Sequence, residues 1–374
     1  MIYLDNAATT KALPEVISEY SKYAGELYFN PSAIYHEGVS VKACIEDART
    51  VILKALGTHN GNVVFTSSAT ESNNLAIFGS YRSNFKKVIF SIEEHPSVYN
   101  VALELKNRGV NVDFCPLSQN GQVDYDKLEQ MLDEDVGFIS IMHVSNETGA
   151  INDLKRIYDI KMKKCPKAIF HVDGVQAFSK VKVNLDYFGV DLYTISGHKI
   201  FGPKGVSALF VRNGIVLKPI MFGGGQENNL RSGTENVPAI MGLKVAIQNI
   251  GNIKEYFEYV KSLKNKFIEN LNGIACNFNT TNDNSPYVLS ISFKGVKGET
   301  LVHMMEQHGI LISTGSACSS KKAGNRVLEA LGVNHNDIIG SVRVSFSRYN
   351  TMEEVDFSSK TLKNCYIELI EKLR

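Results

Sequence analysis

Short apolar runs alternate with amphipathic segments between residues 62 and 211 of this 374-residue chain. Apolar runs of this length are typical of buried strands, and amphipathic segments such as residues 97–108 are typical of helices. The alternation predicts an α/β fold in which a mostly parallel central sheet is flanked by helices. The runs that we interpret as strands are residues 62–66, 87–92, 110–114, 138–144, 168–172, 190–195 and 206–211.

The pattern changes near residue 240, where the sequence becomes mainly helical. A charged run between residues 254 and 266 is typical of a solvated helix face, and a smaller α+β unit follows it. We therefore predict an N-terminal segment (1–14) that packs on the small domain, a large domain (15–240) and a small C-terminal domain (241–374). In the small domain we predict strands at 287–293 and 342–346 and helices at 299–308 and 351–373.

Polar residues follow three consecutive predicted strands, at positions where only a turn is required. Asn146 follows the first, Asp173 the second, and Lys199 the third, within Ser-Gly-His-Lys. Ligands of parallel sheets collect beyond the carboxyl ends of the strands. An aspartate and a lysine there suit pyridoxal phosphate, because the carboxylate can pair with the pyridinium nitrogen while the lysine forms the Schiff base.

Small hydroxyl residues follow the predicted strand at 62–66 and open a helix. A helix N-terminus offers free backbone N–H groups and a favourable dipole, so this stretch suits a phosphate group. A plain helix N-cap explains the same residues equally well. The stretch is therefore a candidate phosphate site with an open structural alternative.

Charge and composition exclude several classes of partner. The 40 basic and 39 acidic residues give a net charge of +1, so no global field draws nucleic acid or an anionic membrane to the chain. No secretory signal or membrane-spanning run is visible, and we expect a cytoplasmic protein. The six cysteines show no C-x-x-C pair and no zinc-finger spacing, so we expect no metal site.

The motifs at the strand ends belong to a longer series that covers nearly the whole chain. The series comprises residues 3–10, 30–32, 65–74, 94–95, 143–149, 171–176, 196–205, 231–234, 313–318 and 343–345. In this order the motifs resemble those of the cysteine desulfurases in the class V aminotransferase family. The resemblance implies an aspartate-aminotransferase-like fold and removal of sulfur from L-cysteine, which leaves L-alanine.

The resemblance also assigns the contacts of pyridoxal phosphate and the substrate. It implies that Lys199 carries the cofactor and moves the substrate Cα proton, while Asp173 holds the ring nitrogen. Gln176 would hydrogen-bond the ring hydroxyl. His95 would stack on the ring and assist proton transfer, and Asn146 would lie near the ring and the substrate.

The phosphate and the substrate carboxylate have their own implied contacts. The implied phosphate ligands are Ala69, through its backbone, Thr70, Ser196, His198 and Thr234. Thr234 would reach the phosphate of the other subunit, which makes a homodimer necessary for activity. Arg343 would clamp the substrate carboxylate with its planar, bidentate guanidinium, assisted by Asn30.

Cys318 lies in Ser-Thr-Gly-Ser-Ala-Cys-Ser-Ser, a run of small residues that predicts an exposed active-site loop at about 313–325. A thiol needs access and motion to act as a nucleophile. By the resemblance, Cys318 takes the sulfur as a persulfide, through which it could also ligate an iron–sulfur cluster transiently. The Ser-Ala-Cys setting is similar to the longer-loop group, which hands sulfur directly to several acceptors.

The sulfur acceptor stays open between an iron–sulfur scaffold protein and a tRNA-thiolation enzyme. The sequence stops at Arg374 without the tail that often helps to dock a scaffold. Other class V enzymes, such as a selenocysteine lyase or a transaminase, are the alternative, and a non-catalytic adaptor is a further one. Ser68 stands where the family usually has glycine and Gly174 where alanine is frequent, and we expect both departures to be harmless.

Overall fold

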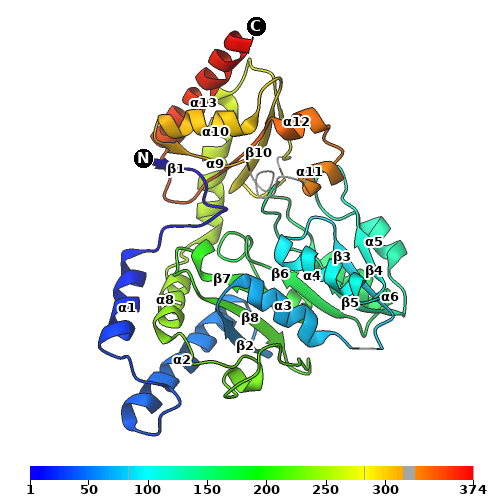
Figure 1. The fold of residues 1–374 in the computed structure, drawn as a ribbon, viewed down its shortest axis with the longest axis vertical. Coiled ribbons are helices and arrows are strands. Elements are labelled where there is room, and N and C mark those ends of the chain that lie inside the picture. The colour runs from blue at the N-terminus through cyan, green and yellow to red at the C-terminus, as the bar shows by residue number, and fades with distance from the viewer. Residues whose placement is uncertain (83, 282, 315–324, 374) are drawn as a thin grey trace.

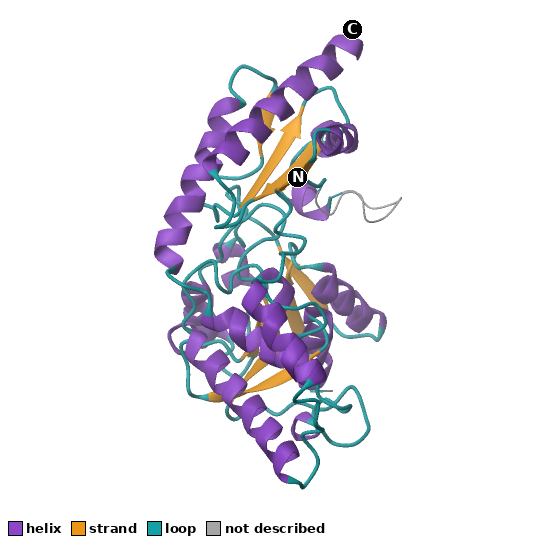
Figure 2. Ribbon diagram, turned by 90° about the vertical axis from the view of Figure 1, so that its left-hand side faces the viewer, coloured by secondary structure: helices purple, strands orange, loops and turns teal. Residues whose placement is uncertain are grey.

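The computed structural model describes residues 1–82, 84–281, 283–314 and 325–373. Figure 1 shows two lobes, one above the other, and Figure 2 shows the same arrangement from the side. The lower lobe contains the larger sheet, and the upper lobe carries the C-terminus. Within the described part of the chain, no helix is both long enough and apolar enough to cross a membrane.

The large lobe is built on a sheet with the strand order β2-β8-β7-β6-β5-β3-β4. Strand β8 runs antiparallel to β2 and β7, and the pairs β7–β6, β6–β5, β5–β3 and β3–β4 are parallel. The prediction of a mostly parallel sheet is therefore confirmed. The strands are β2 (Gly61–Thr66), β3 (Lys87–Ser91), β4 (Val112–Cys115), β5 (Val136–Ser140), β6 (Ile169–Asp173), β7 (Leu192–Ser196) and β8 (Ser207–Arg212).

Helices cover both faces of this sheet. Along β2, Val63 and Phe65 belong to the core on one face and Val64 to the core on the other, because side chains alternate along a strand. The first core also contains residues of α1 (Pro14–Gly25), α2 (His36–Ala55), α5 (Tyr125–Met131), α6 (Leu154–Lys164), α7 (Leu185–Phe188) and α8 (Val237–Gln248). The second contains residues of α3 (Ala69–Ser80) and α4 (Pro96–Asn107).

The small lobe has an antiparallel sheet of order β12-β10-β9. Its elements are α9 (Ile253–Asn270), β9 (Cys276–Phe278), β10 (Val288–Phe293), α10 (Gly298–Gln307), β11 (Ile310–Leu311), α11 (Arg326–Ala330), α12 (His335–Ile339), β12 (Ser341–Ser345) and α13 (Met352–Leu373). Strand β1 (Ile2–Tyr3) pairs with β11, and Leu4 is buried in the core of this lobe. The chain then crosses to the large lobe at α1.

The hydrophobic cores change between α8 and α9. Helix α8 contributes Ile247 to the core of the large lobe, and Val260 of α9 belongs to the core of the small lobe. Gly251 lies between the two helices with a φ of 72°, a left-handed backbone conformation that favours glycine at the end of a helix. We therefore propose that the domain boundary lies between these helices rather than near residue 240.

Candidate active site

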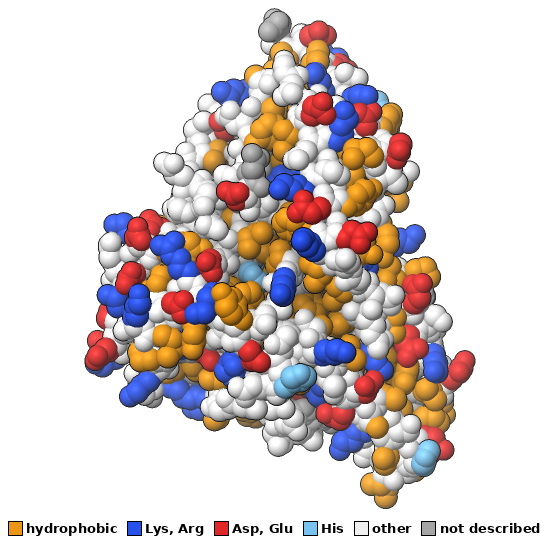
Figure 3. All heavy atoms as spheres, turned by 180° about the vertical axis from the view of Figure 1, so that it is seen from behind, with side chains coloured by type: hydrophobic (Ala, Val, Ile, Leu, Met, Phe, Trp, Pro, Cys, Tyr) orange, Lys and Arg blue, Asp and Glu red, His pale blue; other side chains and the backbone are white. Residues whose placement is uncertain are grey.

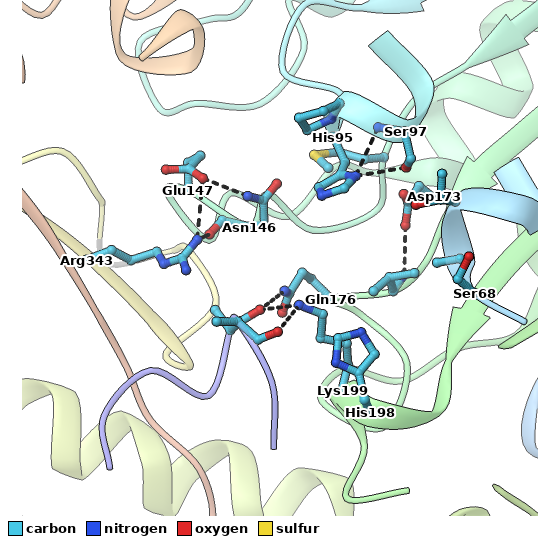
Figure 4. A pocket seen from close by; sticks show the side chains of 17 residues that line it. Ser68, His95, Ser97, Asn146, Glu147, Asp173, Gln176, His198, Lys199 and Arg343 are labelled. Carbon is cyan, nitrogen blue, oxygen red and sulfur yellow. Dashed lines mark hydrogen bonds and ion pairs between the residues drawn. The ribbon is translucent and has the colours of Figure 1, made fainter. Parts of the chain in front are cut away.

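A cavity of about 510 Å³ lies where the carboxyl ends of β3, β5, β6 and β7 face the small lobe (Figure 4). Its size is within the range usual for small-molecule sites. The N-terminal segment and β12 complete its wall. The lining residues are Ala7, Ala8, Ser68, Ala69, Thr70, His95, Pro96, Ser97, Met142, Asn146, Glu147, Asp173, Val175, Gln176, His198, Lys199 and Arg343.

Asp173, the last residue of β6, is buried in the cavity wall with both carboxylate oxygens fixed. Asn73 Nδ2 donates to one oxygen at 2.8 Å, and the backbone N–H of Val175 donates to the other at 3.0 Å. Both donors are neutral, so the carboxylate keeps its negative charge available for a cationic partner. A pyridinium N–H is such a partner, and this geometry suits the contact predicted for Asp173.

Lys199 follows β7 in a turn that glycine makes possible. A Cβ on Gly197 would lie 2.8 Å from the carbonyl oxygen of Pro203, too close for any larger residue without a shift. Lys199 Nζ donates to the carbonyl oxygens of Ala7 at 2.5 Å and Ala8 at 2.7 Å. Burial of the amine, reinforced by the charge of Arg343, lowers the pKa of Lys199 to about 8. A substantial uncharged fraction near neutral pH suits a reactive amine.

His95 begins helix α4 from the end of β3 and opens onto the cavity. Its Nδ1 accepts the backbone N–H of Ser97 at 3.1 Å and contacts Ser97 Oγ at 2.8 Å (Figure 4). In the neutral ring the proton therefore lies on Nε2. Desolvation by the surrounding walls lowers the pKa of His95, which favours this neutral form.

Arg343 reaches the cavity from β12 of the small lobe and is held by three groups of other elements. Its Nη2 contacts Asp5 Oδ1 at 3.2 Å, and its Nη1 contacts the carbonyl oxygen of Asn146 at 3.0 Å and Glu147 Oε1 at 3.4 Å. Asn146 Nδ2 donates to the same Glu147 oxygen at 2.7 Å. Within the described residues, Arg343 Nε has no hydrogen-bond partner. The guanidinium is thus held at the cavity wall by these contacts, while one of its N–H groups stays unpaired in the described part of the chain.

Ser68 is the N-cap of α3, and its Oγ accepts the N–H of Glu71 at 3.2 Å. The N-cap alternative is therefore correct for this side chain. The backbone at Ser68 is extended, with a φ of −162°, so a serine fits at this position, where the resemblance led us to expect glycine. Ala69 and Thr70 form the first turn and line the cavity, where N-terminal N–H groups have no intrahelical partner.

A second cavity of about 340 Å³ adjoins the first, since Ala8, Ser68 and His198 line both. Ser196, at the end of β7, and Lys204 also line it. Burial, followed by the charges of Lys199, Lys204 and Lys180, lowers the pKa of His198 to about 4. A neutral imidazole, hydroxyl groups and a helix N-terminus together suit a phosphate group.

Four predicted site residues are not among those lining the main cavity, and one of them, Ser196, lines the adjoining cavity instead. Thr234 lines a separate cavity of about 120 Å³ together with Ser67 and Arg231. Asn30 is exposed, and its Oδ1 accepts the N–H of Ser32 at 2.8 Å. Cys318 lies outside the described residues, as does most of the loop predicted at about 313–325.

The structure adds residues that the sequence did not single out. Asp5 and Glu147 contact Arg343, Asn73 holds Asp173, and the carbonyl groups of Ala7 and Ala8 hold Lys199. These contacts join segments far apart in the chain, so no local spacing could have revealed them. All five residues stood inside recognised motifs, and that membership was the one available signal.

The arrangement fits pyridoxal phosphate. A fixed carboxylate, a reactive amine, an imidazole and a helix N-terminus surround one cavity, and each matches a different part of the cofactor. Asp173 would hold the ring nitrogen, Lys199 would carry the cofactor, and the first turn of α3 with Ser196 and His198 would hold the phosphate. Clusters of three or more metal-ligating side chains are not found among the described residues.

Comparison with known proteins gives the same family over the whole chain. Residues 2–357 match the family model for aminotransferase class-V. Cysteine desulfurase IscS 1 of Archaeoglobus fulgidus is 37% identical over an alignment of 383 residues, which covers 100% of this chain and 98% of that protein. A solved NifS-like protein has a TM-score of 0.92 at 33% identity and covers 99% of both chains.

A solved structure of SspA in complex with cysteine has a TM-score of 0.83 at 29% identity and covers 94% of this chain and 100% of that one. The family match and the full-length relatives agree with the cavity geometry. The chain belongs to the class V aminotransferase family of pyridoxal-phosphate enzymes, and within it to the cysteine desulfurases.

Proposed function

We propose that this enzyme breaks the Cβ–S bond of L-cysteine, transfers the sulfur to Cys318 and releases L-alanine. In the net reaction, the sulfur of the substrate thiol joins the Cys318 thiol as a persulfide, and the substrate Cβ gains a hydrogen to become the methyl group of alanine. Atoms and electrons therefore balance without a further oxidant or reductant. One observation carries the proposal. A single cavity gathers Lys199, Asp173, His95 and Arg343, each at a different part of the space that a cofactor and an amino acid would share.

The described residues on either side of Cys318 support its part in the reaction. Ser313 pairs with Arg343 through backbone hydrogen bonds of 3.1 and 2.6 Å. Asn325 Nδ2 donates to Glu147 Oε2 at 3.2 Å. Both contacts are made with residues that line the cavity. The described residues on both sides of Cys318 in the sequence therefore contact the wall of the proposed active site.

Bound pyridoxal phosphate supplies an electron sink that acidifies the substrate Cα proton. Lys199 is the group that we propose to move this proton, since its lowered pKa raises the fraction of neutral amine near physiological pH. His95, with its proton on Nε2, can hand a proton to the substrate side of the cavity. Arg343 would bind the substrate carboxylate and fix which bonds face these groups.

The decisive experiment measures alanine and persulfide from L-cysteine in the wild type and in Cys318→Ala. We expect the variant to lose sulfur transfer but to keep bound cofactor and its absorbance. Wild-type turnover by Cys318→Ala would refute the persulfide step. Turnover that depends on an added keto acid and forms no persulfide would favour a transaminase, and a strong preference for selenocysteine would favour a selenocysteine lyase.

We also propose that the active enzyme is a homodimer in which Thr234 serves the site of the other subunit. Large apolar side chains are exposed at Ile34 (96%), Phe222 (83%) and Tyr28 (70%). Hydrophobic side chains are also visible on the side formed by α1 and α2, at the lower right of Figure 3. Thr234 lies in a cavity of its own rather than in the main one, which fits a contribution to a second copy.

Mixed dimers test this arrangement. Thr234→Ala should weaken cofactor binding, and Lys199→Ala should abolish activity. If Thr234 crosses the interface, mixing the two variants restores one complete site per mixed dimer, because Lys199 of one subunit then meets Thr234 of the other. If Thr234 serves its own subunit, mixing restores nothing. Light scattering of the wild type measures the oligomeric state directly.

The acceptor of the sulfur is the remaining part of the proposal. We propose a cytoplasmic acceptor protein, either an iron–sulfur scaffold or a tRNA-thiolation enzyme. Wild-type enzyme loaded with labelled cysteine would be mixed with each purified candidate, and transfer of label would be followed by mass spectrometry. Cys318→Ala is the matched control, since it should load no label. Equal labelling of a bystander thiol protein would contradict a dedicated acceptor.

A further inference from the structure

Lys180 is a buried amine that the reaction described above does not use. It follows β6 in the turn that starts after Asp173, and it is 7% exposed. Its Nζ donates to Oε1 of Gln176 at 2.7 Å. The ring of Tyr287, from the small lobe, lies 5.9 Å from the same Nζ. A lysine is seldom buried this deeply unless it has a partner.

The contact with Lys180 determines which way the amide of Gln176 points. The protonated form of Lys180 can only donate hydrogen bonds, so it requires the amide oxygen of Gln176 to face it, as the structure has it. The Nε2 donor then faces the other way, where it contacts the carbonyl oxygen of Ala7 at 2.8 Å in the cavity wall. The same carbonyl accepts Lys199 Nζ at 2.5 Å. Gln176 thus presents a donor, and not an acceptor, to the cavity.

We propose that Lys180 is a positioning residue for the cofactor, which locks the Gln176 amide so that its N–H₂ group donates to the anionic ring oxygen of pyridoxal phosphate. The proposal rests on the proposed contact of Gln176 with that oxygen. A free amide could rotate and turn its carbonyl oxygen toward the ring oxygen. Two acceptors would then face each other in a buried site, which is costly.

The charge of Lys180 has a second consequence for Lys199. The two amines lie on either side of the link formed by Gln176 and the Ala7 carbonyl. Burial, followed by the charges of Lys199 and Arg343, lowers the pKa of Lys180 to about 7. The charges of Asp5 and Asp173 raise the pKa of Lys199, whereas burial and the charge of Arg343 lower it. Removal of a positive charge at position 180 should therefore raise the pKa of the nitrogen at position 199.

The chain offers a matched control for the burial of a lysine. Lys264 is 5% exposed, and its Nζ lies 3.4 Å from the carbonyl oxygen of Ser285. Burial lowers its pKa to about 8. Neither Lys264 nor its hydrogen-bond partner Ser285 is among the residues that line the main cavity. Lys264→Met therefore reproduces the loss of a buried amine without changing the orientation of Gln176.

The test compares Lys180→Met, Gln176→Leu, the double variant and Lys264→Met. Apoprotein is titrated with pyridoxal phosphate to give Kd, and the loaded protein is titrated with acid and base while the cofactor absorbance is followed. Thermal unfolding of each apoprotein reports folding. If Lys180→Met does not fold, Lys180→Gln replaces it, because a glutamine can donate or accept and so imposes no orientation.

We expect Lys180→Met to weaken cofactor binding about tenfold, the effect of one lost hydrogen bond to a charged group, and to raise the absorbance pKa. Lys264→Met should leave both unchanged. In the Gln176→Leu background, Lys180→Met should change Kd less than about twofold, since the two act through one contact. Lys180→Arg, which keeps a charged donor, should restore most of the affinity.

Two results would overturn the proposal and can be told apart. If Gln176→Leu weakens binding but Lys180→Met does not, Lys180 has no part in orienting the amide. If Gln176→Leu leaves Kd unchanged, the contact of Gln176 with the ring oxygen fails, and the inference about Lys180 fails with it. Neither result bears on sulfur transfer by Cys318, which the alanine and persulfide assay measures separately.

Discussion

Gly174 is the residue whose substitution tests the packing behind the active site most directly. It follows Asp173, and a Cβ at this position would lie 2.0 Å from Cζ, 2.1 Å from Cε1 and 2.4 Å from Oη of Tyr193. Separations below about 3 Å force a shift of one group. Tyr193 is fully buried, and its hydroxyl contacts Nδ1 of the buried His143 at 2.9 Å. Gly174→Ala should therefore be strongly destabilising.

The magnitude follows from two costs. Overpacking of a buried site costs about 1–3 kcal/mol. If Tyr193 moves away, its hydroxyl and His143 both lose a buried partner, which costs about 1–3 kcal/mol more. We expect a total near 4 kcal/mol. If the backbone moves instead, Asp173 is displaced, and the affinity for pyridoxal phosphate falls together with stability.

A double-mutant cycle measures this coupling. Denaturant unfolding of the apoproteins gives the free energy of unfolding for the wild type, Gly174→Ala, Tyr193→Met and the double variant. Because methionine is narrower and flexible, Gly174→Ala should cost less than about 1 kcal/mol in the Tyr193→Met background. An equal cost of Gly174→Ala in both backgrounds would refute the clash with Tyr193, and wild-type stability of Gly174→Ala would refute it outright.

Three further predictions concern charged groups. Arg49 contacts both carboxylate oxygens of the buried Glu227 at 2.7 and 2.9 Å. Arg49→Met should therefore lower the free energy of unfolding, measured with denaturant, by about 3–5 kcal/mol. Adding Glu227→Gln to this variant should recover part of the loss, because it removes the unpaired buried charge. Burial raises the pKa of Glu93 from 4.5 to about 8, so the folded protein keeps a proton that the unfolded chain loses in this range. As the pH rises from 4.5 to about 8, the free energy of unfolding of the wild type should fall relative to that of Glu93→Gln by up to about 1.4 kcal/mol per pH unit. A difference between the two proteins that does not change with pH would contradict this. Arg343→Lys should raise KM for L-cysteine about 10–100-fold with a smaller change in kcat, and unchanged KM would exclude it as the carboxylate clamp.

The sheet and its strand ends could be predicted from the sequence because both follow local rules. Buried parallel strands are apolar runs, and their carboxyl ends carry the ligand-binding residues. Asp173 and Lys199 were recognised in this way, and both line the cavity. The end of one strand was misplaced. The apolar run at 138–144 continues past β5, which ends at Ser140, because the residues beyond it are buried without pairing as a strand.

The contacts that orient the proposed catalytic and substrate-binding groups could not be predicted, because they join distant segments. Arg343 contacts Asp5 from the other end of the chain, and Lys199 contacts the carbonyl groups of Ala7 and Ala8. Such contacts depend on strand β1 pairing with β11, which brings the N-terminal segment to the small lobe. A two-residue strand has no periodicity that a sequence can reveal.

The two departures from the family pattern differ in what the structure says about them. Ser68 replaces a glycine at an extended position and adds an N-cap, so its side chain is accommodated by local geometry alone. At Gly174, where the resemblance led us to expect alanine, Tyr193, 19 residues away on the neighbouring strand, occupies the space that a Cβ would need. A residue that looks like a neutral replacement in sequence is thus half of a packing pair. The same principle applies to Gln176, because its buried partner Lys180 contacts the amide oxygen and so favours one orientation of the amide.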